Sequence, residues 1–238
     1  MEKHPQPVAL VTGANKGLGL EIARQLGQHG FTVVLGARQD KGAAPAAELR
    51  AQNIDAHPIT LDVTAAADIA AAATFLEQQF GRLDVLVNNA GVQLDNGFDV
   101  SPDTLRQTYE ANVIGPYAIT QALLPLLRQS PAGRIVNQSS ILGSLTAISQ
   151  GQGGSWATPG YTSSKAALNM LTVVLAQHLA DTAIKVNAAH PGWVKTDLGG
   201  ADAPLDVTEG AKTAVRLALL PADGPTGGYF HDSERLPW

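Results

Sequence analysis

Short apolar runs alternate with helix-like stretches along most of this 238-residue sequence. The first run, Val8–Val11, lacks the polar alternation of a half-exposed strand and so predicts a strand buried on both faces. It ends at Thr12-Gly13, and the stretch from Leu18 to Gln28 then predicts a helix. Because the same pattern repeats along the chain, it favours a parallel sheet that is covered by helices on both faces.

The repeated pattern predicts a doubly wound α/β sheet of about seven strands. Strands are expected at Val8–Val11, Phe31–Leu35, Ile54–Asp62, Leu83–Val87, Arg134–Asn137, Ile184–Ala189 and Gly227–Phe230. Helices are expected at Leu18–Gln28, Ala43–Gln52, Ala65–Phe80, Pro102–Arg128, Tyr161–Leu179 and Thr208–Leu220. Gly115-Pro116 should bend or split the fourth helix, because proline lacks the amide hydrogen of a helical bond. No shift in composition marks a second domain, so residues 1–238 are expected to form one domain.

Composition excludes several kinds of function. The chain has no cysteine, which rules out disulfides, thiolate metal sites and cysteine nucleophiles. A formal net charge of −5 argues against a protein that binds nucleic acid. No apolar run approaches the ~20 residues that cross a bilayer, and Val8–Val11 is too short for a signal peptide, so a cytoplasmic location is expected. The six histidines show no metal-ligand spacing, and no metal site is expected.

Polar and glycine-rich clusters follow four of the predicted strands, at the ends where parallel sheets bind ligands. They are Thr12–Gly19, Asn88–Gly91, Ser139-Ser140 and Pro191–Thr196. The glycines of the first cluster would let the backbone turn tightly and approach a pyrophosphate, which a helix N-terminus attracts. A glycine-rich turn without a ligand is the alternative, because the spacing differs from the commoner Gly-x-Gly-x-x-Gly pattern.

Tyr161 and Lys165 lie four residues apart, which places them on one face of the predicted helix. Free tyrosine has a pKa of about 10 and exchanges protons poorly at neutral pH unless a cation lies beside it. Lys165 would supply that cation. The pair alone is common in unrelated helices, so its significance depends on the motifs around it.

The motifs together resemble those of the short-chain dehydrogenase/reductases. Thr-Gly-x-x-x-Gly-x-Gly at 12–19, Asn-Asn-Ala-Gly at 88–91, Tyr-x-x-x-Lys at 161–165 and Pro-Gly at 191–192 occur in that family's order and spacing. The stretches 13–19, 83–91 and 191–197 and the terminal Trp238 look most like the carbonyl-reductase branch. The resemblance covers nearly the whole chain and implies a Rossmann fold and an oxidoreductase that uses a nicotinamide cofactor.

The resemblance implies catalytic roles for Asn112, Ser140, Tyr161 and Lys165. Tyr161 would exchange a proton with the substrate oxygen, while Lys165 would lower the pKa of the tyrosine and bind the nicotinamide ribose. Ser140, supported by Ser139, would hydrogen-bond the substrate carbonyl and stabilise the charge that grows on its oxygen. Asn112 would hold a water of the proton relay. The alternative for Asn112 is a structural asparagine whose buried amide is satisfied by the protein.

A cofactor site is implied as well. Its residues would be Gly13, Asn15, Lys16, Gly17, Leu18, Gly19, Arg38, Asp62, Val63, Asn88, Ala90, Gly91, Tyr161, Lys165, Pro191, Gly192, Val194 and Thr196. NAD-preferring members carry an acidic residue after the second strand, where this chain has Ala37 and Arg38. Arg38 and Lys16 suit a 2′-phosphate, so NADPH (NADP+) is expected in preference to NADH. The alternatives are solvated surface charges for these two cations and a helix N-terminal charge for Asp62.

Twenty residues separate Ser140 from Tyr161, more than most family members have. Either this segment is a loose surface insertion, or it covers the active site and blocks a subunit interface, so homo-oligomer and monomer both stay open. We expect Leu142, Trp156 and Trp193 to line the substrate pocket, with a packed core position as the alternative for Trp193. Gly199-Gly200-Ala201 would permit a mobile lid.

These expectations favour an NADPH-dependent reductase that converts a ketone or aldehyde to an alcohol. The partner would be a small carbonyl or alcohol substrate, with no nucleic acid and no membrane. One alternative is an alcohol dehydrogenase that works in the oxidative direction with NAD(P). Another is a non-catalytic protein that senses NADPH on the same fold, although such proteins typically lose the tyrosine or the lysine.

Overall fold

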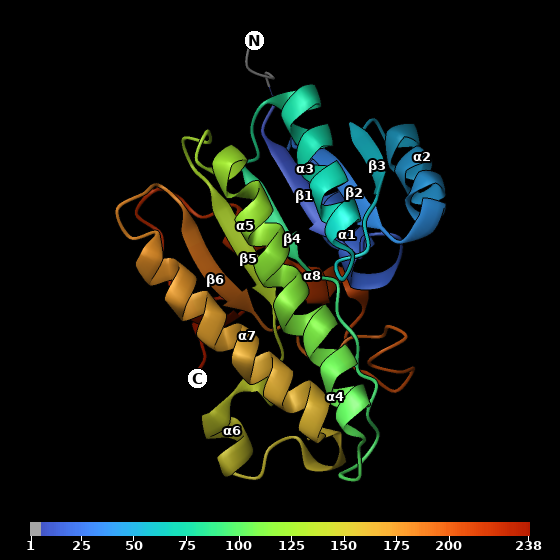
Figure 1. Ribbon diagram of the computed structural model, residues 1–238, viewed down its shortest axis with the longest axis vertical. Coiled ribbons are helices and arrows are strands. Elements are labelled where there is room, and N and C mark those ends of the chain that lie inside the picture. Colours follow the sequence, from blue (N-terminus) through green and yellow to red (C-terminus); the bar gives the residue numbers. More distant parts are fainter. Residues whose placement is uncertain (1–5) are drawn as a thin grey trace.

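Eight strands form one sheet in the computed structural model, which describes residues 6–238 (Figure 1). The strands are β1 Val8–Thr12, β2 Thr32–Ala37, β3 Ala56–Thr60, β4 Val85–Asn88, β5 Arg134–Gln138, β6 Lys185–Ala189, β7 Gly228–His231 and β8 Glu234–Arg235. Their order is β3-β2-β1-β4-β5-β6-β7-β8. β1 to β7 run parallel and β8 pairs antiparallel with β7. The predicted parallel sheet is confirmed, with β8 as an additional short strand.

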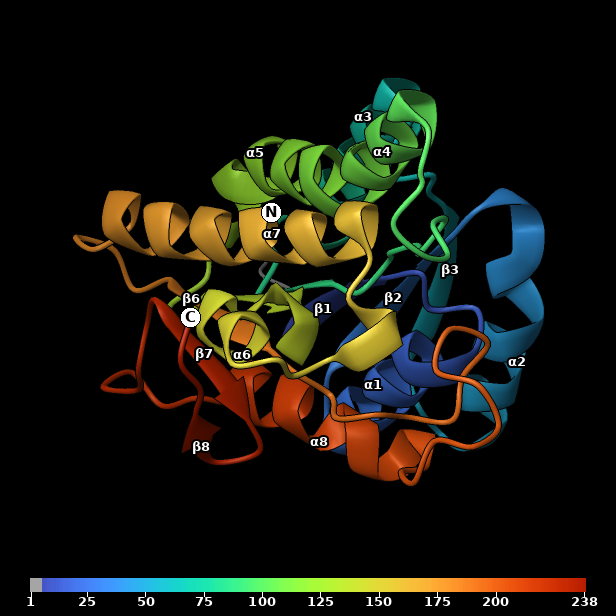
Figure 2. The same ribbon diagram turned by 90° about the horizontal axis from the view of Figure 1, so that it is seen from below.

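Helices cover both faces of this sheet, as Figure 2 shows. The α-helices are α1 Gly17–Gln28, α2 Ala43–Ala51, α3 Ala66–Phe80, α4 Pro102–Tyr109, α5 Gly115–Leu127, α6 Leu145–Ser149, α7 Pro159–His178 and α8 Val207–Ala218. Short 3-10 turns are η1 Gln39–Gly42, η3 Ile141–Gly143 and η4 Gly154–Trp156. α1, α2 and α8 lie on one face, and α3, α5 and α7 lie on the other (Figure 2). The layers are therefore those of a doubly wound Rossmann fold.

The central strands are apolar throughout because both of their faces are buried. In β1, Ala9 and Val11 pack into the core on the α1 and α8 side, whereas Val8 and Leu10 pack into the core on the α3 and α5 side. Alternate side chains of a strand point to opposite faces, so a strand between two helical layers needs apolar residues at every position. This is why the run lacked polar alternation.

The helix expected at 102–128 is interrupted one turn earlier than predicted. It runs from Pro102 to Leu127 but passes through a π-helical turn, η2, at Glu110–Ile114. Pro116 has no amide hydrogen to donate to the preceding turn, so a wider turn forms there instead of a break. Gly115 packs closely against the residues that follow β3, since a Cβ on it would lie 2.7 Å from the Val63 carbonyl oxygen.

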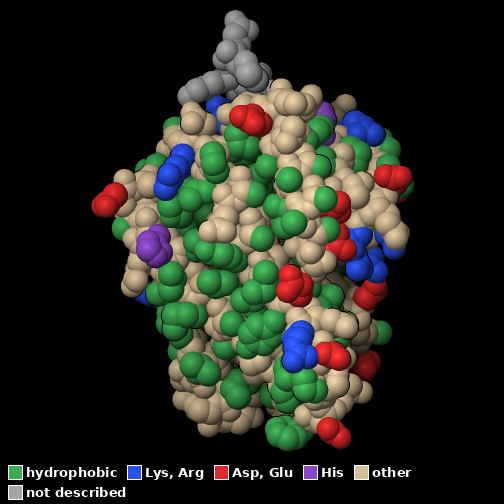
Figure 3. Space-filling view, viewed as in Figure 1, with side chains coloured by type: hydrophobic (Ala, Val, Ile, Leu, Met, Phe, Trp, Pro, Cys, Tyr) green, Lys and Arg blue, Asp and Glu red, His purple; other side chains and the backbone are tan. Residues whose placement is uncertain are grey.

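Residues 1–5, which the single-domain prediction includes, lie outside the described residues. Within residues 6–238, no helix has the length and apolar character needed to span a bilayer. Ile114, Tyr117 and Met170 are exposed on the outer sides of η2, α5 and α7, where Figure 3 shows hydrophobic side chains.

Candidate active site

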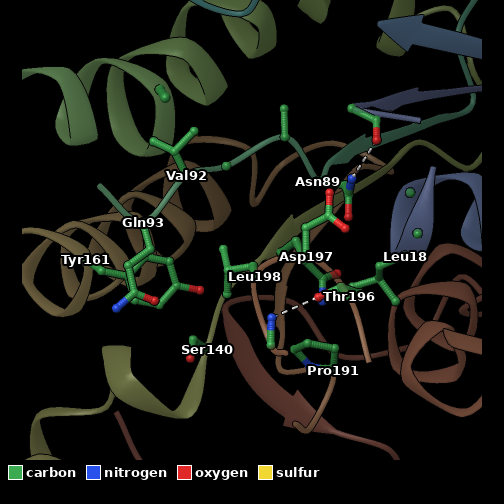
Figure 4. A pocket seen from close by; sticks show the side chains of 18 of the residues that line it. Leu18, Asn89, Val92, Gln93, Ser140, Tyr161, Pro191, Thr196, Asp197 and Leu198 are labelled. Atoms are coloured by element: carbon green, nitrogen blue, oxygen red, sulfur yellow. Dashed lines mark hydrogen bonds between the residues drawn. The ribbon is translucent and has the colours of Figure 1, made fainter. Parts of the chain in front are cut away.

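A cavity of about 1040 Å³ extends along the carboxyl ends of the parallel strands (Figure 4). Most of the predicted site residues line it. They are Gly13, Asn15, Lys16, Gly17, Leu18, Gly19, Arg38, Asp62, Val63, Ala90, Gly91, Ser140, Leu142, Trp156, Tyr161, Lys165, Pro191, Gly192, Trp193, Val194 and Thr196. Asn88 and Asn112 do not line it. The fold therefore brings together segments as far apart in the sequence as Gly13 and Thr196.

The loop between β1 and α1 leaves room for a ligand because its glycines carry no side chains. Gly13 and Gly17 have φ of 65° and 55°, in the left-handed region that favours glycine. A Cβ on Gly19 would lie 2.5 Å from the Gly13 carbonyl oxygen, so the loop packs too closely for any other residue. No side chain caps α1 at its N-cap residue, Lys16. The first amides of α1 are thus open to an anion, as a dinucleotide pyrophosphate requires.

Thr12 and Asn89 hold this loop in place, a role that the sequence motifs did not predict. The Thr12 hydroxyl accepts hydrogen bonds from the amides of Asn89 (3.0 Å) and Ala90 (2.9 Å). The Asn89 side chain donates to the carbonyl oxygens of Thr12 (2.9 Å) and Gly13 (3.4 Å). The sequence signal that could have revealed this contact is the position of the two residues in the motifs Thr12-Gly13 and Asn88–Gly91. These motifs follow β1 and β4, which are adjacent strands.

Asn88, which was predicted to contact the cofactor, points away from the cavity. Its side-chain nitrogen donates to Oδ1 of Asn137 at 2.9 Å and to the Thr120 hydroxyl at 3.3 Å, and the residue is buried. Asn88 ends β4 and Asn89 follows it outside the strand. The side chain of Asn89 bonds instead to Thr12 and Gly13 at the end of β1. Asn89 is the one of the two that reaches the cavity.

Tyr161 and Ser140 bring two hydroxyl groups together in the cavity, on the side opposite Leu18 and Thr196 in Figure 4. Burial raises the pKa of Tyr161 to about 12, and a hydrogen bond with Ser140 opposes that rise. Lys165 lies with its ammonium 5.6 Å from the centre of the tyrosine ring and donates to the Gln138 carbonyl oxygen at 2.8 Å. Burial lowers the pKa of Lys165 to about 8.

These pKa directions differ from the expected lowering of the tyrosine pKa. Desolvation favours the neutral form of both groups, and for Tyr161 it outweighs the lowering of the pKa by the hydrogen bond with Ser140. At neutral pH Tyr161 is therefore protonated, and Lys165 is protonated in most molecules. Both side chains can therefore donate hydrogen bonds at this pH.

Asn112 lies outside the cavity and its amide is fully used by the protein. Its side-chain oxygen accepts from the Val92 amide at 2.8 Å, and its nitrogen donates to the Val92 carbonyl (2.8 Å) and the Ser164 hydroxyl (3.0 Å). It is completely buried in the π turn η2. These contacts match the structural alternative, in which Asn112 joins the loop after β4 to α7.

Asp95 is a buried residue that no motif pointed to. Its carboxylate accepts from the Gly160 amide at 2.5 Å and from the Tyr161 amide at 3.2 Å. A Cβ on Gly160 would lie 2.9 Å from this carboxylate, so the approach requires glycine. The loop after β4 is thereby tied to the first turn of α7, which carries Tyr161.

The segment between Ser140 and Tyr161 forms a structured wall rather than a loose insertion. It contains η3, α6 and η4. The Ser144 hydroxyl donates to the Pro237 carbonyl at 2.9 Å, and the Thr146 amide donates to the Trp238 carbonyl at 2.9 Å. The ring of Trp238 stacks on Tyr229, with centroids 5.6 Å apart. The C-terminal tail thus holds this wall in place.

Two tryptophans stand at the mouth of the cavity beyond the hydroxyl pair. The rings of Trp156 and Trp193 are 6.2 Å apart and tilted by 59°, and both side chains are about half exposed. Trp193 donates from Nε1 to the Gly199 carbonyl at 2.7 Å, which closes the loop 193–199. Leu142 lines the cavity as a buried residue. The alternative of a packed core position for Trp193 does not apply.

Charged side chains lie at the end of the cavity opposite the two tryptophans. Arg38 lines the cavity after β2, and Lys16 forms an ion pair with Asp197 across the mouth. Asp62 accepts from the amide (2.9 Å) and hydroxyl (2.8 Å) of Thr64. The backbone bond from Thr64 is the largest cause of a lowered Asp62 pKa, to which Arg38 also contributes. Among residues 6–238 no cluster of histidines and carboxylates could hold a metal ion.

His190 also lines the cavity, although the sequence predicts no specific role for it. Its Nδ1 accepts a hydrogen bond from the Ile141 amide at 3.3 Å, next to Ser140. Burial, with a smaller effect of His231, lowers the pKa of His190 to about 3. A neutral imidazole thus fixes the backbone that follows Ser140.

The short chain dehydrogenase family model matches residues 7–204. (−)-Isopiperitenone reductase of Mentha piperita is 34% identical in an alignment that covers 97% of this chain and 98% of that protein. Carbonyl reductase [NADPH] 1 of Mus musculus is 34% identical, with coverage of 98% and 99%. Among solved structures, the NADPH-bound carbonyl reductase from chicken fatty liver has a TM-score of 0.86 and 30% identity, and the match covers 98% of this chain and 99% of that one.

Proposed function

The chain belongs to the short-chain dehydrogenase family and is an oxidoreductase, and we propose that it reduces a ketone or aldehyde carbonyl to an alcohol with NADPH. The observation that carries this proposal is the Ser140–Tyr161 hydroxyl pair, which lies in one cavity with a glycine loop and two cations on one side and apolar walls on the other. The names of the similar reductases support it.

The two hydroxyl groups would act on the substrate oxygen. NADPH, when bound, would supply the hydride that adds to the carbonyl carbon. Tyr161 is protonated at neutral pH, since its pKa is about 12, and would donate its proton as the oxygen becomes negative. An alkoxide is a far stronger base than a phenolate, so this transfer is favourable despite the raised pKa. Ser140 would stabilise the growing charge by a second hydrogen bond.

The remaining cavity residues would hold the cofactor. The glycine loop 13–19 and the open first turn of α1 fit a pyrophosphate, while Arg38 and Lys16 fit the 2′-phosphate. Asp62 and Val63 would contact the adenine, and Lys165 the nicotinamide ribose. Val194 and Thr196 would meet the carboxamide. We propose that residues 6–238, the described part of the chain, form one domain around this cavity.

Replacing Arg38 by alanine is expected to weaken NADPH binding about 10- to 100-fold, the effect of losing charge-assisted bonds to a phosphate. The affinity for NADH, which lacks the 2′-phosphate, should change less than about 3-fold. Isothermal titration calorimetry of both cofactors measures the difference. The control is Arg106→Ala, which removes an exposed arginine paired with Asp103 on α4. Equal losses for both cofactors would favour the NAD-dependent alternative.

Replacing Asp95 by alanine is expected to lower kcat by about 10-fold, because a shift of the catalytic helix by a fraction of an ångström disturbs proton transfer. The Kd of NADPH should stay unchanged, since Asp95 does not line the cavity. Asp95→Asn keeps one acceptor oxygen and should recover part of kcat. Asp103→Ala, at an exposed acid in the first turn of α4, is the control. A lowered stability with kcat unchanged would contradict this positioning role.

A further inference from the structure

The side chain of Gln138 lacks hydrogen-bond partners in the part of the chain that the structure describes. Gln138 is the last residue of β5 and is 5% exposed. Its Nε2 and Oε1 atoms are both buried, and neither bonds to a described residue. A primary amide offers two donors and an acceptor. Because buried polar groups in proteins are nearly always paired, this amide calls for a partner from outside the chain.

The amide lies on the glycine-loop side of the sheet. In β5 the Asn137 side chain bonds to Thr172 on α7, so the next side chain faces the opposite layer. Val136 packs with α1 and α8 on that layer, and Gln138 shares its direction. The register places Gln138 beside Ala189 of β6, which has no polar side chain to offer. Gln138 lines the same cavity as the glycine loop.

Its place along the sheet assigns Gln138 to one half of that cavity. Arg38 follows β2 and Asp62 follows β3, at one edge of the strand order. Gln138 ends β5, two residues before Ser140. A dinucleotide with its 2′-phosphate beside Arg38 and its reactive ring beside Ser140 would cross from β2 to β5. The group above Gln138 would therefore be the nicotinamide nucleotide and not the adenosine.

We propose that the Gln138 side chain binds the nicotinamide half of NADPH. This inference rests on the function proposed above. That half of the cofactor carries ribose hydroxyls, a carboxamide and phosphate oxygens, so it presents donors as well as acceptors. A primary amide matches such a mixed set, whereas the glycines around it contribute no side-chain polar atom. Binding of the cofactor would then satisfy an amide that the free protein leaves unpaired.

Gln138→Met tests the proposal because it keeps the length of the side chain and removes the amide. Its Kd for NADPH should rise about 10-fold, whereas its Kd for 2′,5′-ADP, which lacks the nicotinamide half, should stay within about 2-fold of wild type. The ligand-free protein should melt about 2–4 °C higher, since an unpaired buried amide is gone. Calorimetric titration and thermal melting of the full chain measure these opposite effects.

Two further variants complete the experiment. Gln138→Glu keeps the shape but sets a negative charge beside the cofactor, and should weaken NADPH binding more than Gln138→Met does. Gln121→Met changes an exposed glutamine of α5 and should alter neither property. An unchanged Kd of NADPH in both Gln138 variants, or an equal loss for 2′,5′-ADP, overturns the inference. A wild-type chain that binds neither ligand overturns the proposed function itself.

Discussion

Tyr161→Phe is expected to lower the rate of carbonyl reduction by at least about 1000-fold, within the range for the loss of a positioned general acid. The phenyl ring fills the same space, so the cavity and its glycine loop should be undisturbed. The Kd of NADPH is expected to stay within about 2-fold of wild type. Loss of turnover with retained binding would separate the chemical role of the hydroxyl from any role in holding the cofactor.

The measurement is NADPH consumption with a panel of quinones, aromatic ketones, ketoesters and aldehydes, alongside calorimetric titration of NADPH. Tyr117→Phe is the matched control, because Tyr117 is an exposed tyrosine of α5 that bonds to Gln121. Unchanged turnover in Tyr161→Phe would exclude the proposed acid. A wild-type chain that binds NADPH but reduces no member of the panel would favour the non-catalytic alternative.

Gly19→Ala should reduce NADPH affinity by at least about 100-fold, since two or more cofactor contacts would be lost with the loop geometry. The added Cβ would lie 2.5 Å from the Gly13 carbonyl oxygen and 2.4 Å from the Asn89 side-chain nitrogen. Backbone must therefore move, and the bonds that join Asn89 to Thr12 and Gly13 would be broken. The pyrophosphate site would lose its shape.

Gly30→Ala provides the control for this substitution. Gly30 has a φ of 85°, and a Cβ there would meet no atom within 4 Å. It should cost about 1–2 kcal/mol of unfolding free energy through backbone strain, with the Kd of NADPH unaffected. Calorimetric titration and urea unfolding of both variants distinguish the two effects. Retained NADPH affinity in Gly19→Ala would contradict the assignment of the glycine loop.

The fold was largely predictable because strands buried on both faces of a parallel sheet have continuous apolar sequences. β1 showed as an unbroken apolar run since both of its faces are covered, and glycines or prolines marked many element ends. β8 could not be foreseen, because it has two exposed polar residues, Glu234 and Arg235. The sequence predicted that Pro116 disturbs the helix, but not that a π-helical turn forms at Glu110–Ile114. Whether a helix breaks or forms a π turn depends on packing.

The site was predictable where one stretch of sequence carries the chemistry and not where distant segments meet. The glycine loop and the Tyr161–Lys165 pair are local patterns and could be found. Asp95 contacts Gly160 across 65 residues, so no spacing rule reveals it. The raised pKa of Tyr161 follows from burial, which only the assembled structure defines. For the same reason the sequence could not show that Asn89 lines the cavity and Asn88 does not.

The positions of the tryptophans allow binding in the cavity to be followed by intrinsic fluorescence. The chain has three tryptophans, and two of them, Trp156 and Trp193, stand at the cavity mouth. The third, Trp238, stacks on Tyr229 beneath the wall that the C-terminal tail supports. Reduced nicotinamide absorbs where indole emits, so a bound cofactor would quench their emission by energy transfer. Occupancy of the cavity can thus be followed spectroscopically without attaching a dye.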